Sequence, residues 1–200
     1  MSPPRLILAS TSSGRRLVLA NAGVPFEALS PEVDEAEIKR TLAQRSADGR
    51  EIAETLAERK ACRISEEHRD ALVIGADQVM ACAGRMFDKP ASLEEARAHL
   101  QFLRSRQHEL ISAVCVAQGG RAIWRCTETA RLTMHDFDDA FLDRYLAASG
   151  KEVLTSVGCY RLEGLGPHLF SAIDGDFFTI LGLPLLPLLP FLARHGIGFA

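Results

Sequence analysis

The sequence lacks a large excess of charge of either sign. Lysines and arginines number 23 and aspartates and glutamates number 26, so the formal net charge is −3. A protein that coats DNA or RNA needs a strong positive excess to neutralise the phosphates, and this balance argues against a general nucleic-acid binder. Hydrophobic residues make up 47% and charged residues 24% of the chain, as in average globular proteins. That composition excludes a disordered tail, a collagen-like fibre and a coiled coil.

Paired cysteines and a long hydrophobic span are also missing. The cysteines are odd in number and show no C-x-x-C spacing, which fits neither a disulfide framework nor a zinc site: Cys62, Cys82, Cys115, Cys126 and Cys159. The uncharged stretch 177–193 contains three prolines and is shorter than the roughly 20 residues that a membrane helix needs. The N-terminus has no apolar core long enough for a signal peptide. We therefore expect a soluble cytoplasmic protein that binds neither membranes nor nucleic-acid polymers.

The length and the hydrophobic pattern predict a single α/β domain over residues 1–200. At roughly 150 residues per domain, one domain is expected, with two lobes at most. Strands are expected at 5–9, 26–29, 71–75, near 156–160 and near 177–181, with a hairpin of 108–117 and 121–132 around Gly119-Gly120. Helices are expected at 15–22, 51–67, 92–103, 138–148 and after Pro184. This alternation indicates a mixed, twisted sheet with flanking helices.

The first candidate for chemistry is the turn from Ser10 to Arg16, between an expected strand and an expected helix. Small hydroxyl residues and Gly14 allow backbone N–H groups to approach an anion at a helix N-terminus. Arg15 and Arg16 add fork-shaped donors that suit phosphate oxygens. The alternative is an ordinary helix cap with surface charges. The segment lacks the spacing of a Walker A loop.

The second candidate is Asp77, at the expected C-terminal end of the strand 71–75. Ligands of α/β sheets usually bind at that end, where a carboxylate can orient a water or hold a metal. The alternative is a turn or capping aspartate. Lys60, Lys89 and the pair Asp34-Glu35 are weaker signals, because solvated lysines and acidic pairs at helix starts are common. The histidines are scattered, which predicts surface or boundary positions: His68, His99, His108, His135, His168 and His195.

Taken together, the motifs resemble those of the Maf family of nucleotide pyrophosphatases over essentially the whole chain. They occur in family order: residues 6–12 followed by Arg15-Arg16, 33–35, 56–61, 75–77, 88–90, 163–166 and 182–185. The resemblance implies an elongated, two-lobed Maf/ITPase-like α/β fold with a central cleft. It also implies a homodimer that hydrolyses nucleoside triphosphates to monophosphates and pyrophosphate with a divalent cation, Mg²⁺ or Mn²⁺.

The resemblance assigns roles residue by residue. Asp77 matches the catalytic carboxylate that activates water, and it shares metal binding with Glu35. Ser10, Arg15, Lys60 and Lys89 match the residues that contact phosphate, with Arg16 as the alternative arginine. The assignment makes chemical sense because cleavage of the α–β anhydride builds charge on phosphoryl oxygens, which nearby cations stabilise.

Two departures from the family pattern bear on these roles. The usual Ser-Pro-Arg-Arg run is replaced by residues 12–16, so which arginine faces phosphate is left open. Gln78 and Glu163 stand where thymidine and uridine triphosphate enzymes carry Thr and Gln, and they resemble the subgroup that acts on 7-methyl-GTP. A glutamate accepts hydrogen bonds from the N1–H and amino group of a guanine. The alternative for Glu163 is a rim residue paired with Arg161.

Three functions are compatible with this pattern. We expect a housecleaning nucleoside triphosphate pyrophosphatase acting on modified nucleotides, with a preference for guanine. A catalytically weak, nucleotide-binding regulator of septum formation is the main alternative, since the family is associated with septum arrest. Hydrolysis of the γ-phosphate is the third, because nothing in the sequence fixes which phosphorus is attacked.

Overall fold

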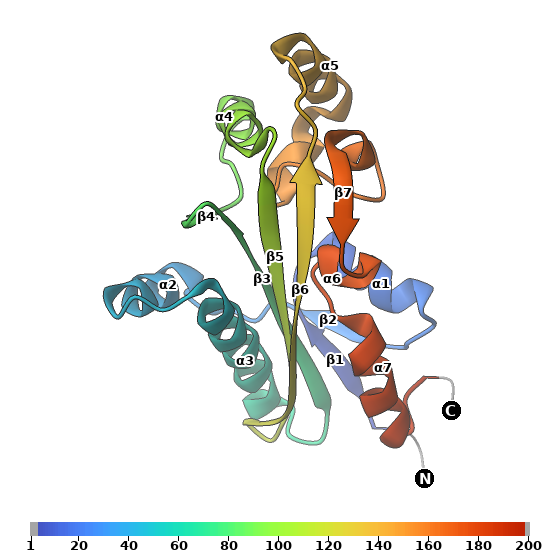
Figure 1. Ribbon diagram of the computed structural model, residues 1–200. Helices are drawn as coiled ribbons and strands as arrows, with labels where there is room; N and C mark the ends of the chain where they lie inside the picture. Colours follow the sequence, from blue (N-terminus) through green and yellow to red (C-terminus); the bar gives the residue numbers. More distant parts are fainter. Residues whose placement is uncertain (1–3, 199–200) are drawn as a thin grey trace. The chain divides into compact units, whose positions relative to one another are not determined.

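The structure, a computed structural model, describes residues 4–198 (Figure 1). Residues 1–3 and 199–200 of the expected 1–200 domain lie outside this range, and so does the start of the N-terminal segment in which no signal peptide is expected. Within it the strands form one sheet of seven, in the order β2-β1-β3-β5-β6-β7 with β4 beside β3. Strand bounds are β1 Leu6–Ala9, β2 Glu27–Leu29, β3 Leu72–Cys82, β4 Arg85–Phe87, β5 Gln107–Gln118, β6 Arg121–Met134 and β7 Phe170–Asp174.

Helices occupy most of the connections between the strands. They are α1 Ser13–Asn21, α2 Glu35–Gln44, α3 Gly49–Glu67, α4 Leu93–Leu103, α5 Asp139–Ser149, α6 Phe177–Ile180 and α7 Leu185–Arg194, with 3₁₀ turns η1 Gly150–Thr155 and η2 Gly166–Leu169. Side-chain oxygens cap the first five: Ser12, Asp34, Asp48, Ser92 and Asp138. Each such cap stabilises its helix by about 1 kcal/mol. The caps explain why these helices begin where they do.

The sheet is mixed, which confirms the predicted α/β class. Strand β1 pairs in parallel with β2 and with β3, whereas β3–β4 and β6–β7 are antiparallel. The chain divides into two compact units. Unit 1 comprises residues up to Gln78, 112–128 and those from Leu181 onward, and unit 2 comprises 79–111 and 129–180. The predicted central cleft is not tested by the structure and stays a prediction.

Unit 1 is organised around the short strand β1. All four of its residues are buried, so it reads as a continuous apolar run, as expected for a strand covered on both faces. Figure 1 shows α3 on one side of β1 and β2, and α1 with α7 on the other. Ile7 and Val73 pack with Ile64 of α3 in one apolar cluster. This packing places α3 beside the parallel pair β1–β3.

Unit 2 has its own apolar core. Leu100 of α4, Leu132 of β6 and Leu142 of α5 are fully buried within it. The expectation that all histidines lie at the surface or boundary is wrong for two of them. His99 and His108 are 5% and 1% exposed, because each finds a partner inside the core: His99 packs edge-on against Phe87, and Nε2 of His108 lies 2.7 Å from the Tyr160 hydroxyl.

Three predicted elements differ from the structure. Strand β3 continues to Cys82, because Met80–Cys82 pair with the unpredicted strand β4, so Asp77 lies inside a strand rather than at its end. The segment 156–160 forms no strand, since the backbone turns sharply at Cys159, which has a φ of 59°. The segment 177–181 starts as helix α6, which Asp176 initiates by accepting hydrogen bonds from the N–H groups of Phe178 and Thr179.

Helices α1, α3, α4, α5 and α7 and the hairpin agree with expectation, whereas helix α2 and strand β7 are not among the expected elements. Gly119 and Gly120 both have positive φ, as a two-residue hairpin turn with right-handed strand twist requires. Gly150 ends α5 at a φ of 55°. In the part of the chain that the structure describes, no helix combines the length and the apolar character needed to cross a membrane.

Candidate functional site

A buried lysine in unit 1 joins two carboxylates. The Nζ of Lys60, on α3, lies 2.6 Å from Oδ1 of Asp77, on β3, and 2.8 Å from Oε1 of Glu35, the first residue of α2. Lys60 and Asp77 are 4% and 6% exposed, whereas Glu35 is half-exposed. A buried lysine–aspartate pair carries a large desolvation cost and is weak evidence for a purely stabilising role. Three residues that were distant in sequence therefore form one cluster.

Gly75 allows the side chains of Lys60 and Asp77 to come within hydrogen-bonding distance. A Cβ added at Gly75 would lie 2.2 Å from the carbonyl oxygen of Ala57 and 2.6 Å from the amide nitrogen of Ala61, both on α3. Only glycine allows the helix backbone to approach β3 this closely. Lys60 lies between these two helix residues in sequence, and Asp77 lies two residues beyond Gly75. The expected motif 75–77 thus combines a glycine that allows close packing with a carboxylate that pairs with Lys60.

Glu35 stays ionised despite partial burial. Desolvation alone would raise the pKa of this carboxyl, but the hydrogen bond from Lys60 and the positive charges of Lys60, Lys39 and Arg15 together lower the pKa below its usual value. Asp34 has a different task, since its Oδ1 accepts a hydrogen bond from the Glu37 N–H and caps α2. Of the predicted acidic pair, Glu35 therefore belongs to the cluster and Asp34 begins the helix.

Arg15 is the arginine that belongs to the cluster. Its Nε donates to the carbonyl oxygen of Gly182 at 2.8 Å, and its Nη1 lies 3.4 Å from Oγ of Ser10. Burial lowers the pKa of Arg15, while the nearby charges of Asp77 and Glu35 oppose that shift. The side chain of Arg16, in contrast, is exposed.

The turn after β1 adds hydroxyl groups at the start of α1. Ser10 is buried, and its Oγ accepts a hydrogen bond from the Ser12 N–H at 3.2 Å. Ser12 caps α1 by accepting from the Arg15 N–H. The helix-capping alternative is thus correct for Ser12. The helix N-terminus carries the partial positive charge that favours phosphate.

Gln78 and Gly182 lie against the same arginine. A Cβ added at Gly182, whose φ is 90°, would lie 3.5 Å from two guanidinium nitrogens of Arg15 and 3.7 Å from the amide carbon of Gln78. The Gln78 amide also donates to Oγ of Ser112 at 2.9 Å. Ser112 and the Gly182 carbonyl were not predicted as site features. The Gly-Leu-Pro motif at 182–184 does not indicate that the Gly182 carbonyl accepts a hydrogen bond from an arginine far away in sequence.

The other two predicted residues belong to unit 2. Lys89 is exposed in the connection between β4 and α4. Glu163 lies in the loop before η2, and Arg161 donates to its Oε1 from Nε at 2.9 Å and from Nη2 at 2.8 Å. The pairing with Arg161, which was the alternative for Glu163, is therefore present in the structure. Its role toward a base stays a prediction, as do the roles of the residues in unit 1.

The donor set suits a cation that is bound together with its substrate. Among residues 4–198, no group of three or more histidine, cysteine, aspartate or glutamate side chains could hold a metal ion. Glu35 and Asp77 offer carboxylate oxygens, and Lys60 occupies only one oxygen of each. Mg²⁺ is commonly held by one or two carboxylates plus substrate phosphates and waters. The residues present fit that manner of binding.

Comparisons with known proteins give a consistent result. The family model described as Maf-like protein matches residues 5–195. A "Nucleoside triphosphate pyrophosphatase" of Caulobacter vibrioides is 53% identical and is covered, like this chain, over 98% of its length. A second protein of that name, from Granulibacter bethesdensis, is 49% identical over 96% of this chain and 97% of its own. A "7-methyl-GTP pyrophosphatase" of Rhizobium meliloti is 46% identical over 96% of this chain and 97% of its own.

Proposed function

The chain belongs to the Maf family, and on that premise we propose that it hydrolyses the α–β phosphoanhydride of nucleoside triphosphates. The products are a nucleoside monophosphate and pyrophosphate, and the biological role is housecleaning of modified nucleotides. The observation that carries the proposal is the cluster of the buried Lys60 and Asp77 with the half-exposed Glu35, and with Arg15 beside it. The choice of the α–β bond rests on relatives that are named pyrophosphatases.

Asp77 is the residue we propose to activate water. Lys60 occupies Oδ1, and among the described residues no donor occupies Oδ2. Oδ2 can therefore accept a hydrogen bond from a water and take up its proton as the water oxygen attacks phosphorus. The P–O bond to the leaving group breaks, and pyrophosphate departs. Lys60 also holds the Asp77 carboxylate in place, because its Nζ lies 2.6 Å from Oδ1.

Lys60 and Arg15 retain donors for the phosphate oxygens. The lysine ammonium has three N–H groups, of which two point to Asp77 and Glu35. The guanidinium has five N–H groups, of which Gly182 and Ser10 accept two. The remaining donors stabilise charge that builds on the phosphoryl oxygens in the transition state. Ser10 and the N-terminus of α1 support the same phosphate chain, and Lys89 of unit 2 is assigned to it by the family resemblance.

In this proposal a divalent cation balances the negative charge of the substrate phosphates. Lys60 and Arg15 are already matched by Asp77 and Glu35, so the cluster has no surplus positive charge for a triphosphate. We propose that Glu35 and Asp77 hold Mg²⁺ or Mn²⁺ together with the substrate phosphates. The ion would neutralise phosphate charge and orient the phosphate chain.

We propose a guanine-type base, with 7-methyl-GTP as the foremost candidate. Gln78 and Glu163 carry this part of the proposal. Glu163 accepts hydrogen bonds from the N1–H and amino group of guanine, and the 7-methylated base adds a positive charge that attracts a carboxylate. Relatives named 7-methyl-GTP pyrophosphatase at 46% and 44% identity support the proposal.

A cytoplasmic homodimer is proposed from the family resemblance, and light scattering of the purified protein tests the dimer.

The decisive experiment supplies the purified protein with Mg²⁺ and a panel of canonical and modified triphosphates. Pyrophosphate and orthophosphate are measured separately. Pyrophosphate with monophosphate supports the proposal, and release should be fastest with 7-methyl-GTP. Orthophosphate with diphosphate would instead indicate attack at the γ-phosphate. Tight nucleotide binding without release of either product would indicate a regulatory binding protein.

A further inference from the structure

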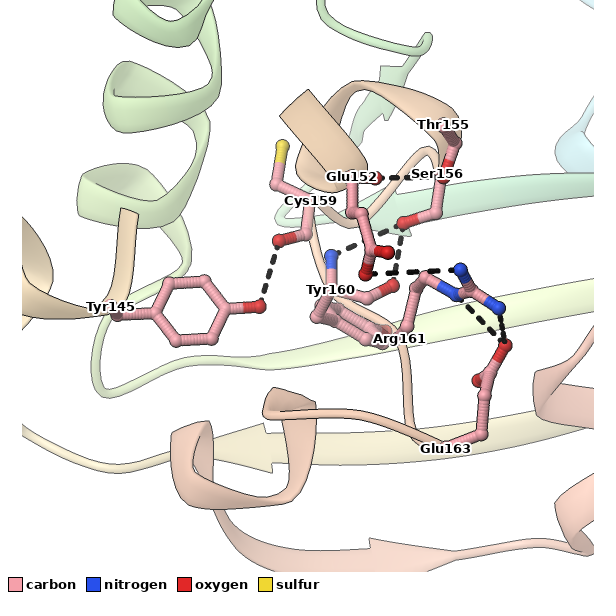
Figure 2. Close-up of polar contacts among 8 residues, drawn as sticks. All are labelled: Tyr145, Glu152, Thr155, Ser156, Cys159, Tyr160, Arg161 and Glu163. Atoms are coloured by element: carbon pink, nitrogen blue, oxygen red, sulfur yellow. Dashed lines mark hydrogen bonds and ion pairs between the residues drawn. The ribbon is translucent and has the colours of Figure 1, made fainter. Parts of the chain in front are cut away.

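Arg161 holds Glu163 through one carboxylate oxygen only. Nε and Nη2 of Arg161 both donate to Oε1 of Glu163, and Nη1 lies 3.8 Å from Oε2 of Glu152 (Figure 2). The side chains of Arg161 and Glu163 are 31% and 22% exposed, so the charged groups of the pair are partly shielded from solvent, whereas the side chain of Glu152 is 69% exposed. Two donors from a planar guanidinium fix the orientation of a carboxylate better than a single ion pair does.

The backbone of Arg161 is fixed from the C-terminal side. Its carbonyl oxygen accepts hydrogen bonds from the N–H groups of Gly164 and Gly166, at 3.1 and 3.0 Å. A Cβ added at Gly166 would lie 2.4 Å from that same oxygen, so the loop closes tightly over the arginine. Glu163 lies inside this closed loop. The main chain and the side chain of Arg161 therefore both restrict where the Glu163 carboxylate can point.

The segment before Arg161 is equally constrained. Ser156 donates through Oγ to the Tyr160 carbonyl at 2.7 Å and accepts from the Tyr160 N–H at 3.1 Å. The Tyr145 hydroxyl donates to the carbonyl of Cys159 at 3.1 Å, and Figure 2 shows these contacts leading into Arg161. Tyr160 is also anchored by His108. Arg161 thus extends from a rigid part of unit 2.

This arrangement leaves one acceptor in a defined place. A carboxylate offers about four lone-pair positions, two on each oxygen. Arg161 uses both positions of Oε1, and among the described residues no donor takes Oε2 of Glu163. A surface glutamate without such a partner would sample several rotamers. Binding of a ligand would then have to fix one rotamer, and the lost side-chain entropy would weaken the affinity for that ligand.

We propose that Arg161 is a specificity-determining positioning residue, which orients Glu163 so that Oε2 is presented to the N–H donors of a guanine-type base. This inference rests on the proposed function, because it takes Glu163 as the residue that contacts the base. Arg161 itself touches no reacting atom. Its contribution is to discrimination between bases, and the chemistry at Asp77 does not depend on it.

The test is a double-mutant cycle with Arg161→Ala, Glu163→Gln and the double variant. Values of kcat and KM are measured for 7-methyl-GTP and GTP, and for ATP and UTP as comparison. Arg161→Ala should lower kcat/KM for the two guanine substrates about tenfold, mainly by raising KM, and change the other two less than twofold. The double variant should match Glu163→Gln, because Arg161 acts only through Glu163.

Two controls belong to the same cycle. Arg131→Ala removes another arginine–glutamate ion pair of unit 2, with Glu109, and Glu152→Gln removes the more distant carboxylate beside Arg161. Both should retain wild-type selectivity. Thermal unfolding of every variant checks that the fold is intact.

The outcomes separate the inference from the function on which it rests. Equal losses for all four substrates, or additive losses in the double variant, would overturn the role of Arg161. Pyrophosphate release without any preference for guanine would overturn it as well, with the proposed function intact. Failure of the wild-type protein to release pyrophosphate from any triphosphate would contradict the proposed function itself.

Discussion

The ammonium of Lys60 and the carboxylate of Asp77 are 2.6 Å apart, and both side chains are almost completely buried in unit 1. Glycine at position 75 makes this approach possible, since it lets α3 lie directly against β3. The pair comes from a helix and a strand that are separated by a turn at residues 68–71. The carboxylate that we propose as the catalytic base is thus held between a helix and a strand.

Replacement of Asp77 by asparagine should abolish catalysis while preserving the fold. The amide has nearly the same shape but cannot take a proton from water, so we expect kcat to fall by about 10² to 10⁴-fold. Pyrophosphate release measures the effect, and circular dichroism checks the fold. Asp70→Asn, at an exposed turn of the same unit, is the matched control and should be fully active. Near-normal turnover of Asp77→Asn would remove this residue from the mechanism.

Replacement of Lys60 by methionine should destabilise the protein as well as inactivate it. The change removes the ammonium that pairs with the buried Asp77 carboxylate, and breaking a buried ion pair typically costs about 3–5 kcal/mol of unfolding free energy. Urea titration measures the loss. The double variant Lys60→Met/Asp77→Asn should regain a substantial part of it, because the uncompensated charge is gone. No recovery in the double variant would mean that packing, rather than charge, causes the loss.

The two adjacent arginines should differ sharply in their effects. Arg15→Ala removes the donor to the Gly182 carbonyl and the cation near Asp77 and Glu35, so kcat/KM should fall at least about 100-fold, in line with the loss of a preorganised charged donor. Arg16→Ala removes an exposed side chain and should cost less than threefold. Steady-state kinetics with the preferred triphosphate compares the two. Equal losses would contradict the assignment of Arg15 as the arginine of the cluster.

An alanine at position 75 should damage both stability and activity. The added methyl group overlaps the backbone of Ala57 and Ala61, and forced separation of packed elements costs about 1–3 kcal/mol or more. The same shift moves Lys60 away from Asp77, so turnover should fall too. Gly164→Ala is the stability control, because a Cβ there meets nothing closer than 3.8 Å. Equal melting temperatures for both variants would exclude the packing role of Gly75.

Acidification should destabilise unit 2 through His108. Burial lowers the pKa of His108 from 6.5 to about 4. Between these values the unfolded chain binds the proton and the folded chain does not, so the unfolding free energy decreases as pH falls, by at most about 1.4 kcal/mol per pH unit. His108→Gln can still bond to the Tyr160 hydroxyl but has no such titration.

Urea titrations of both proteins between pH 6.5 and 5 measure this slope. His108→Gln should lose stability less steeply with falling pH than the wild type. Burial also lowers the pKa of His99, opposed in part by Glu95, but this residue is present in both proteins, and its effect cancels in the comparison. Identical slopes would mean that His108 does not couple folding to pH.

The sequence alone predicts much of this molecule, for identifiable reasons. The helix at 51–67 is expected from apolar periodicity, the helix at 92–103 from a capping box and the helix at 138–148 from the glycine that ends it, and the structure confirms all three. Strand β3 is predicted too short because its continuation depends on pairing with β4, a partner distant from its local pattern. Helix α6 is not predicted because a short apolar run such as 177–181 is compatible with a strand and with a helix. The helix forms because the Asp176 side chain accepts a hydrogen bond from the Thr179 N–H at its start.

The candidate site, like the fold, is predicted only in part from the sequence. Asp77, Lys60, Glu35, Ser10 and Arg15 are predicted by type and order, and the structure brings them together in unit 1. The choice between Arg15 and Arg16 depends on which side chain donates to the Gly182 carbonyl. That contact joins residues 167 positions apart, and no local pattern could predict it.

The boundary between the two units has a consequence for how this protein can be divided. The chain changes unit between residues 78 and 79, 111 and 112, 128 and 129, and 180 and 181, and the first three of these points lie inside β3, β5 and β6. No proteolytic cut or truncation at a single loop can therefore release either half as an independent fragment. Attempts to exchange one half with that of a relative, in order to transfer base preference, would interrupt hydrogen-bonded strands at three places. Preference should instead be altered by point substitutions in the loop around Glu163.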